Sequence, residues 1–346
     1  MINVLATAPI GVTKPAAKKA GSSGFKAVIG QNFKPATTMP QLTKKYPQIT
    51  FGQITRTRTG QPSADVVKGL DEWLSLTEGS PGFSLLKRMT LEDDSIECHA
   101  STDHIYVGEG IFSKGSKYFT SILNHEFEHV LDANLMEAHL KNLAATMSPA
   151  ELKAILSNDE PVLLVQHYEK VLDSAAAMLK DDEHFVSLMT SVKNQTKDGK
   201  THEVLDIFLG KEISLKSLGG IGHFLVDKPE LRTIDKHLRM NYGIPSLYSF
   251  VSKTTNLDRI DSRLSEAYGE SRIRIYPELS STFAELTTQD MKEIYNLGTE
   301  IARKNIATLL QLGYDSGKIK EDVIIEVTKR PPAEQKTYTG PTLLSP

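Results

Sequence analysis

The stretch that most constrains the fold of this chain is residues 116–140, SKYFTSILNHEFEHVLDANLMEAHL. Its apolar residues recur with the 3.6-residue period of an α-helix, so it is predicted to form one long helix. One face of this helix carries a polar stripe, made of Tyr118, Ile122, His125, His129 and Asp132. The opposite face is apolar, made of Phe119, Leu123, Phe127, Val130 and Leu131. The pattern predicts a buried helix whose few polar side chains need partners inside the protein.

Within this helix, residues 125–129 read H-E-F-E-H, an H-E-x-x-H motif. Residues four apart lie on the same helical face, so His125 and His129 can bind one metal ion. Neutral imidazole nitrogen suits Zn²⁺. Glu126 lies about 100° further round the helix, where a carboxylate can act as general base on a zinc-bound water of pKa about 7. The alternative, two hydrogen-bonded histidines on an ordinary amphipathic helix, is less favoured because a metal also supplies the partner that buried imidazoles need.

A catalytic zinc site needs three protein ligands and a water. The extended motif H-E-x-x-H-x-x-G-x-x-H is excluded, because positions 132 and 135 hold Asp132 and Leu135 instead of glycine and histidine. The remaining source of a third ligand is a carboxylate on a later helix. We predict Glu278, in the first turn of a helix that Pro277 begins.

Three other glutamates compete for that role. Glu285 lies on the same helical face as Glu278, and it also suits a second role, in which a carboxylate hydrogen-bonds a ligand imidazole. Glu266 is a further alternative, with Glu270 four residues on. Glu151 is less suited, because Ser148-Pro149-Ala150-Glu151 has the pattern of a helix capping box.

Composition excludes several classes of protein. The 346 residues, 39% of them hydrophobic, can bury one sizeable core or two modest ones. A net charge of −3 favours neither nucleic acid nor a membrane surface as a partner. No apolar run reaches the roughly 18 residues of a membrane span, and the N-terminus has no clear signal peptide. A single cysteine, Cys98, excludes a disulfide framework and a thiolate zinc site. Compartment and oligomeric state remain open.

The chain divides into five segments by composition. Residues 1–45 are predicted to be a disordered basic arm, because Asp65 is the first acidic residue and the segment is rich in lysine and small residues. The other segments are an N-terminal subdomain with the H-E-x-x-H helix (46–140), a helical insertion (141–260), a C-terminal helical subdomain with the third-ligand glutamate (261–328) and a Pro-rich tail (329–346).

The expected elements give an α+β fold. Before the motif helix we expect a strand at 48–57, a helix at 64–76 capped by Ser63, a short helix at 80–89, and strands at 95–100 and 104–112. After it we expect helical pieces at 161–179, 182–192, 202–208, 278–297 and 305–312, and a last strand at 323–327.

These residues resemble the zincin metallopeptidases, and within them the gluzincins, whose third ligand is a glutamate on a later helix. The likeness rests on the H-E-F-E-H motif, on Asp132 three residues beyond it, and on the helix with Glu278 and Glu285. The sequence Phe283-Ala284-Glu285 is similar to that of the anthrax lethal factor type. The likeness covers about residues 46–140 and 262–300 and leaves 141–260 without a counterpart.

The resemblance implies a zincin-like fold, in which a small mixed sheet and an active-site helix are followed by a mainly helical half. The strand at 104–112 would be the edge strand that aligns the substrate. The implied function is a zinc metallopeptidase acting on a peptide or protein. Tyr268, upstream of the third ligand, would donate a hydrogen bond to the reaction's oxyanion, with Tyr276 or His104 as alternatives. Asp132 would orient a ligand imidazole or form a salt bridge.

Other functions remain open from the sequence. One is a zincin-like binding module or a secreted effector with little or no catalysis. Another is a zinc amidohydrolase that acts on a non-peptide substrate through the same three roles.

Overall fold

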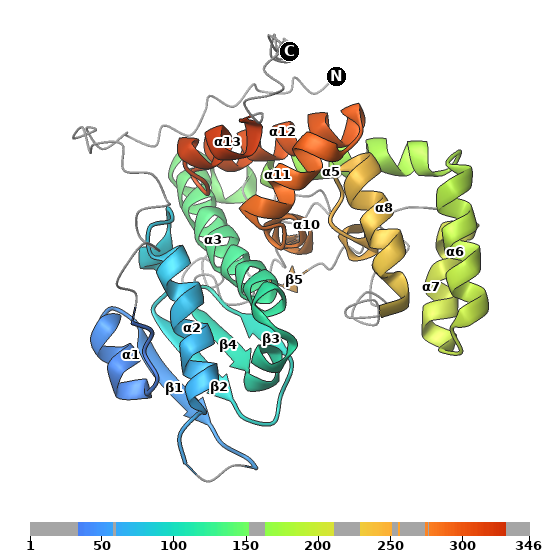
Figure 1. Ribbon diagram of the computed structural model, residues 1–346. Coiled ribbons are helices and arrows are strands. Elements are labelled where there is room, and N and C mark those ends of the chain that lie inside the picture. The colour runs from blue at the N-terminus through green and yellow to red at the C-terminus, as the bar shows by residue number, and fades with distance from the viewer. Residues whose placement is uncertain are drawn as a thin grey trace. The chain divides into compact units, whose positions relative to one another are not determined.

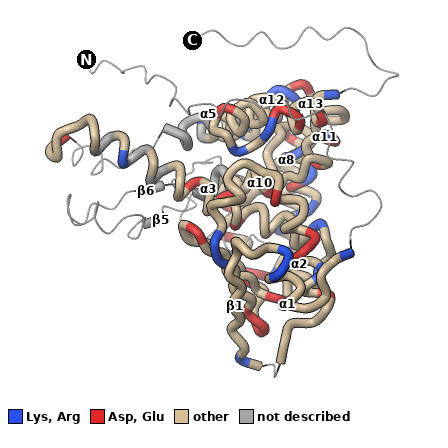
Figure 2. The backbone as a smooth tube through the Cα atoms, turned by 90° about the vertical axis from the view of Figure 1, so that its left-hand side faces the viewer, with Lys and Arg blue, Asp and Glu red and all other residues tan. Residues whose placement is uncertain are grey.

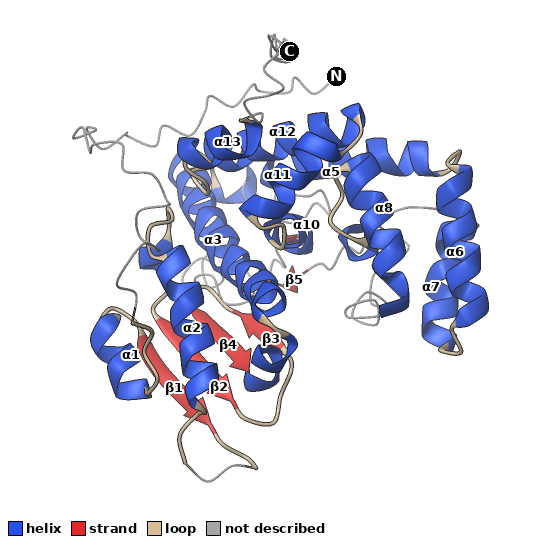
Figure 3. Ribbon diagram, in the orientation of Figure 1, coloured by secondary structure: helices blue, strands red, loops and turns tan. Residues whose placement is uncertain are grey.

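A four-stranded mixed sheet with two helices across one face forms the N-terminal part of the protein (Figures 1 and 3). The computed structural model describes residues 34–57, 60–151, 163–210, 229–250, 255–256, 274–275 and 277–329, together with most of their side chains. The sheet order is β1-β2-β4-β3. Its strands are β1 (Thr50–Ile54), β2 (Arg88–Glu92), β3 (Cys98–Ala100) and β4 (His104–Gly108). The first, second and fourth are parallel, and β3 is antiparallel at one edge.

Apolar side chains alternate along the strands, and the face of the sheet to which they point is the one that helices cover. Met89 and Leu91 of β2, and Ile105 and Val107 of β4, are fully buried in one core. That core also holds the apolar residues of α2 (Ala64–Thr77) and α3 (Ser116–Thr146). Because successive side chains of a strand point to opposite faces, both helices cover the same face of the sheet.

The long helix α3 packs as its sequence predicts. All five residues of the expected apolar stripe belong to the sheet core: Phe119, Leu123, Phe127, Val130 and Leu131. Trp73 of α2 is fully buried beside them and donates from its indole nitrogen to Asn124 Oδ1 at 3.0 Å. The residue just before the H-E-x-x-H motif is therefore tied to the core of the N-terminal subdomain.

The second half of the described chain is helical and has its own core. It comprises α5 (Leu163–Leu179), α6 (Glu183–Gln195), α7 (Gly199–Leu209), α8 (Arg232–Tyr242), α10 (Pro277–Ala284), α11 (Thr288–Leu297), α12 (Glu300–Asp315) and α13 (Glu321–Thr328). A short antiparallel pair is formed by β5 (Thr255–Asn256) and β6 (Arg274–Ile275). Helix α10 packs against both α3 and α5. The coarse expectation of an α+β fold is thus confirmed.

Local capping signals in the sequence are confirmed. Ser63 caps α2 by accepting from the Val66 backbone N–H at 3.3 Å. Ser148 and Glu151 form the expected capping box, in which the Glu151 carboxylate accepts from the Ser148 N–H at 2.9 Å. The helical pieces expected at 161–179, 182–192 and 202–208 correspond to α5, α6 and α7.

The prediction of a helix at 80–89 is wrong. This segment holds only the 3-10 turn η1 (Phe83–Leu85), and strand β2 begins at its end. Residues 88–92 alternate polar and apolar, and both neighbouring strands of β2 supply hydrogen bonds. The edge position expected for 104–112 is also wrong: β4 lies between β2 and β3, and a 3-10 turn, η2 (Glu109–Lys114), follows it.

Three further segments depart from prediction. The single helix expected at 278–297 is two helices, because Thr287 and Asp290 form a capping box that starts α11. The strand expected at 323–327 is the helix α13, which packs against α11 and α12. Within the predicted basic arm, residues 39–45 form the helix α1 (Met39–Lys45), whose Met39 and Leu42 are buried. Residues 1–33 lie outside the described residues.

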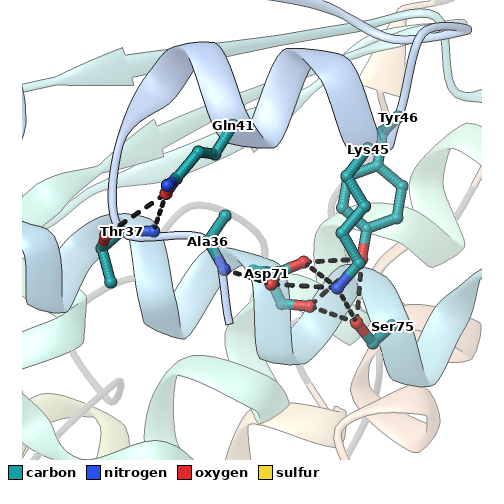
Figure 4. Close-up of polar contacts among 7 residues, drawn as sticks. All are labelled: Ala36, Thr37, Gln41, Lys45, Tyr46, Asp71 and Ser75. Atoms are coloured by element: carbon teal, nitrogen blue, oxygen red, sulfur yellow. Dashed lines mark hydrogen bonds and ion pairs between the residues drawn. The ribbon is translucent and has the colours of Figure 1, made fainter. Parts of the chain in front are cut away.

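A buried carboxylate joins α1 to α2 (Figure 4). Asp71 has no exposed surface and accepts from the Ala36 N–H at 2.7 Å, from Lys45 Nζ at 2.8 Å and from the Tyr46 hydroxyl at 2.8 Å. Burial raises the pKa of Tyr46. The hydrogen bond to Ser75 opposes that shift, and the hydrogen bond that the Tyr46 hydroxyl donates to Asp71 adds to it. This network connects Ala36, at the start of the compact unit, and helix α1 to α2 of the sheet subdomain.

The described helices differ in their charge, and none of them is both long and apolar. None of the described helices has the length and hydropathy to cross a membrane. Figure 2 shows acidic and basic positions along α11 and α12, whereas the charged residues of α13 are all acidic.

We predict that Asp71→Asn lowers the free energy of unfolding by about 2–3 kcal/mol, because hydrogen bonds to a buried charge are lost or weakened. Urea denaturation measures the change. The control is Asp206→Asn, which removes a surface pair with Lys193 and should cost less than about 1 kcal/mol. Equal effects of the two substitutions would show that the Asp71 network does not stabilise the fold.

Candidate metal centre

The two histidines of the motif turn the same ring atoms toward each other. His125 Nε2 and His129 Nε2 are 3.1 Å apart, and the two ring planes meet at 81°. A tetrahedral zinc ion with nitrogen ligands at 2.0–2.1 Å would separate two such atoms by about 3.3 Å. The contact is a hydrogen bond between the two rings, and its length is also close to the separation of two imidazoles that share one metal ion.

The far side of the His125 ring is held by a carboxylate. Glu285 Oε1 lies 3.0 Å from His125 Nδ1, and the two side chains are 19% and 12% exposed. An ionised carboxylate can only accept, so this contact places the imidazole proton on Nδ1 and leaves a lone pair on Nε2. Neutral His125 is thereby in the tautomer that a metal ligand requires.

Glu285 reaches this position from the break between two helices. It follows α10 directly, and its backbone N–H donates to Ser281 at 3.2 Å. Helix α11 then begins at Thr288. Because α10 packs along α3, the break brings the carboxylate to the motif helix.

Glu126 is a buried carboxylate of α3, 6% exposed. Its helix contacts the edge strand β3. Burial raises the pKa of the Cys98 thiol on β3 to about 12, and the negative charge of Glu126 adds to this shift.

Asp132 and Glu128 share a buried lysine. Lys318 Nζ donates to Asp132 Oδ1 at 2.6 Å and also to Glu128 Oε1. Burial raises the pKa of Glu128, an effect that Lys318 opposes and Asp132 reinforces. The salt bridge to Lys318 is one of the roles expected for Asp132.

Sequence patterns did not indicate Tyr248, which lies beside His125, or Asp235, whose pKa is influenced by the charge of Glu285. Tyr248, in the 3-10 turn η5 (Leu247–Phe250), is 7% exposed, and its ring centre is 6.3 Å from that of His125. On α8, burial raises the pKa of Asp235 to about 6; the Leu247 N–H opposes the shift and the charge of Glu285 adds to it. Neither residue has a motif spacing relative to His125, so no sequence signal was available.

His104 is on the wrong side of the sheet to assist at this site. Its Nε2 lies 2.8 Å from Thr90 Oγ1, and its ring stacks on Tyr106 at 4.0 Å. The neighbouring Ile105 points into the core under the helices, so the side chain of His104 points away from α3. The suggestion that His104 donates to an oxyanion is therefore wrong.

The remaining predicted residues are only partly described. Glu278 belongs to the first turn of α10, but its side chain lies outside the described residues. Tyr268, Tyr276 and Glu266 also lie outside them. Among the side chains that are described, no group of three or more His, Cys, Asp or Glu residues is arranged to hold a metal ion.

Comparisons with models of protein families, with curated proteins and with solved structures found no match to this chain.

We predict that Glu285→Ala shifts His125 away from the Nδ1–H tautomer, because the acceptor for that proton is lost. Long-range ¹H–¹⁵N spectra of the imidazoles in metal-free protein report the tautomer. Glu293→Ala, at an exposed position on α11, is the matched control. An unchanged His125 spectrum in Glu285→Ala would show that the carboxylate does not hold the ring.

Proposed function

We propose that this protein is a zinc-dependent metallopeptidase with His125 and His129 as metal ligands and Glu126 as general base. The observation that carries the proposal is the 3.1 Å approach of the two Nε2 atoms, with His125 Nδ1 held by Glu285. Two imidazole lone pairs directed at one point repel each other unless a proton or a cation lies between them. Zinc is the cation that best fits two neutral imidazoles and a carboxylate.

Glu278 is the proposed third ligand. It stands in the first turn of α10, the helix that packs along α3. Glu285 lies at Nδ1 of His125, on the opposite side of the ring from Nε2, which suits an orienting carboxylate rather than a ligand. With Glu285 in the orienting role, Glu278 of α10 is the carboxylate that remains as the third metal ligand.

A bound zinc ion supplies a water of pKa about 7 and polarises the carbonyl of the substrate. Glu126 takes a proton from the attacking water and later delivers it to the nitrogen of the leaving amine. Glu285 keeps His125 in the required tautomer through both steps.

The edge strand next to α3 supports an extended peptide as the substrate. Among the described strands, β3 pairs with β4 alone, and α3, which bears Glu126, contacts it. A peptide added to a sheet edge by backbone hydrogen bonds would run beside the motif helix with its carbonyl groups close to Glu126.

A hydrogen-bond donor for the oxyanion completes the proposed site. Tyr268 holds this role by its resemblance to the tyrosine upstream of the third ligand in gluzincins. Tyr248 is a second candidate, because its ring lies beside that of His125.

We predict that Glu126→Gln keeps the zinc but lowers peptide hydrolysis by about 10²–10⁴-fold, the usual contribution of a general base. A fluorogenic peptide library and zinc content, measured on the same preparations, test this. Glu293→Ala should retain full activity. Wild-type turnover in Glu126→Gln would remove the mechanism.

We predict one zinc per chain in the wild type and almost none in His125→Ala or Glu278→Ala, because each loses a ligand. Mass spectrometry of metal content measures this, with His184→Ala, an exposed histidine on α6, as control. Zinc lost in His125→Ala but kept in Glu278→Ala would move the third ligand to another residue. No zinc in the wild type after addition of the metal would contradict the proposal.

A further inference from the structure

Lys318 enters the interior of the protein from the turn between α12 and α13. It follows Gly317, whose φ of +73° reverses the chain at the end of α12. The side chain is 6% exposed, and its ammonium contacts two carboxylates of α3, Asp132 at 2.6 Å and Glu128. In the sequence, Asp132 lies 186 positions and Glu128 lies 190 positions before Lys318.

The side chains around Lys318 stabilise a positive charge inside the protein. The side chains of Glu128 and Asp132 are 10% and 9% exposed. The ring centre of Tyr168, on α5, lies 6.0 Å from Nζ. Burial lowers the pKa of Lys318, but the charges of Asp132 and Glu128 outweigh it and raise that pKa, so the amine is protonated. A lysine is almost never buried this deeply unless it is paired.

The two carboxylates belong to the turn of α3 that bears a proposed metal ligand. Glu128 directly precedes His129, and Asp132 lies nearly one turn beyond it. The other imidazole is held differently, by Glu285 at His125 Nδ1. The C-terminal part of the chain therefore contacts both histidine positions. Glu285 contacts the ring of His125, and Lys318 contacts the helical turn that bears His129.

We propose that Lys318 is a positioning residue for the metal centre. By holding Glu128 and Asp132 it fixes the turn of His129, so that His129 Nε2 stays directed at His125 Nε2. The inference rests on the proposed function for its metal-binding consequence. The competing explanation is that Lys318 only anchors the α12–α13 turn to the rest of the fold.

The experiment compares three full-length variants with the wild type. Lys318→Met removes the ammonium and leaves two buried carboxylates. The triple variant K318M/E128Q/D132N has similar shape without any of the three charges, which keeps it free of unpaired buried ions. Lys193→Met is the matched control, since it breaks the surface pair with Asp206. Zinc affinity is measured by competition with a chromophoric chelator, and the His129 ring by ¹H–¹⁵N spectra without metal.

The triple variant is expected to unfold at a temperature no lower than the wild type, yet to bind zinc about 10–100-fold more weakly, as when an outer partner of a metal ligand is lost. Its His129 ring signals should shift or double without metal. Lys193→Met should match the wild type in both readouts.

Three outcomes would overturn the proposal. Wild-type zinc affinity and His129 signals in the folded triple variant would reduce Lys318 to an anchor. A triple variant that fails to fold would show that the pairing serves the fold as a whole. If the wild type held no zinc, that result by itself would contradict only the proposed function. Wild-type His129 signals in the triple variant would still contradict the positioning role of Lys318 in that case.

Discussion

The division of α3 into an apolar and a polar stripe is the constraint on which the rest of the structure depends. Burial of Phe119, Leu123, Phe127, Val130 and Leu131 against the sheet fixes the rotation of the helix about its axis. That rotation turns the polar stripe toward the C-terminal helices. Buried polar groups need partners, and the helices between residues 277 and 329 supply them.

Three sets of polar contacts connect α3 to the C-terminal part of the chain, in order from the start of the helix. Lys117 pairs with Asp290 at 2.7 Å, His125 with Glu285, and Glu128 and Asp132 with Lys318. The first has a lysine 72% exposed and adds little to stability. The contact between His125 and Glu285 is partly buried, and the contacts of Lys318 are buried. The two halves of the described chain are thus joined most firmly where the proposed chemistry takes place.

Much of this arrangement could be predicted from local sequence. The 3.6-residue period of the apolar residues predicted the two faces of α3. The four-residue spacing of His125 and His129 predicted that both imidazoles lie on one of these faces. Capping by Ser63 and by Ser148 with Glu151 was readable because each signal lies within a few residues. The suggestion that Glu285 can bond a ligand imidazole agrees with its contact to His125 Nδ1.

Other features depend on packing that local patterns do not contain. Strand β2 includes Met89 and Leu91, which suit a helix equally well, and it becomes a strand between β1 and β4. Helix α13 is rich in β-branched residues, yet Val327 is buried against helices and acidic residues occupy its first turn. No spacing joins Lys318 to Asp132, since its partner is 186 positions away. Long-range pairing of this kind is visible only in the folded chain.

The chemistry of the site follows from one short distance between two rings. Glu285 leaves a lone pair on His125 Nε2, and that atom faces His129 Nε2 at 3.1 Å. Under the proposed function, a cation held by both Nε2 atoms would take the place of the proton between them and would supply a polarised water for Glu126. Helix α3, which bears Glu126, contacts the edge strand β3. The proposed hydrolysis of extended peptides would use these placements together.

X-ray absorption spectroscopy at the zinc edge, on the zinc-loaded wild-type protein, tests this account most directly. The account predicts a four-coordinate shell of nitrogen and oxygen at about 2.0–2.1 Å, with the multiple-scattering pattern of two imidazoles. A shell of oxygen atoms alone, without imidazole scattering, would show that His125 and His129 do not share the metal, and would contradict the central claim.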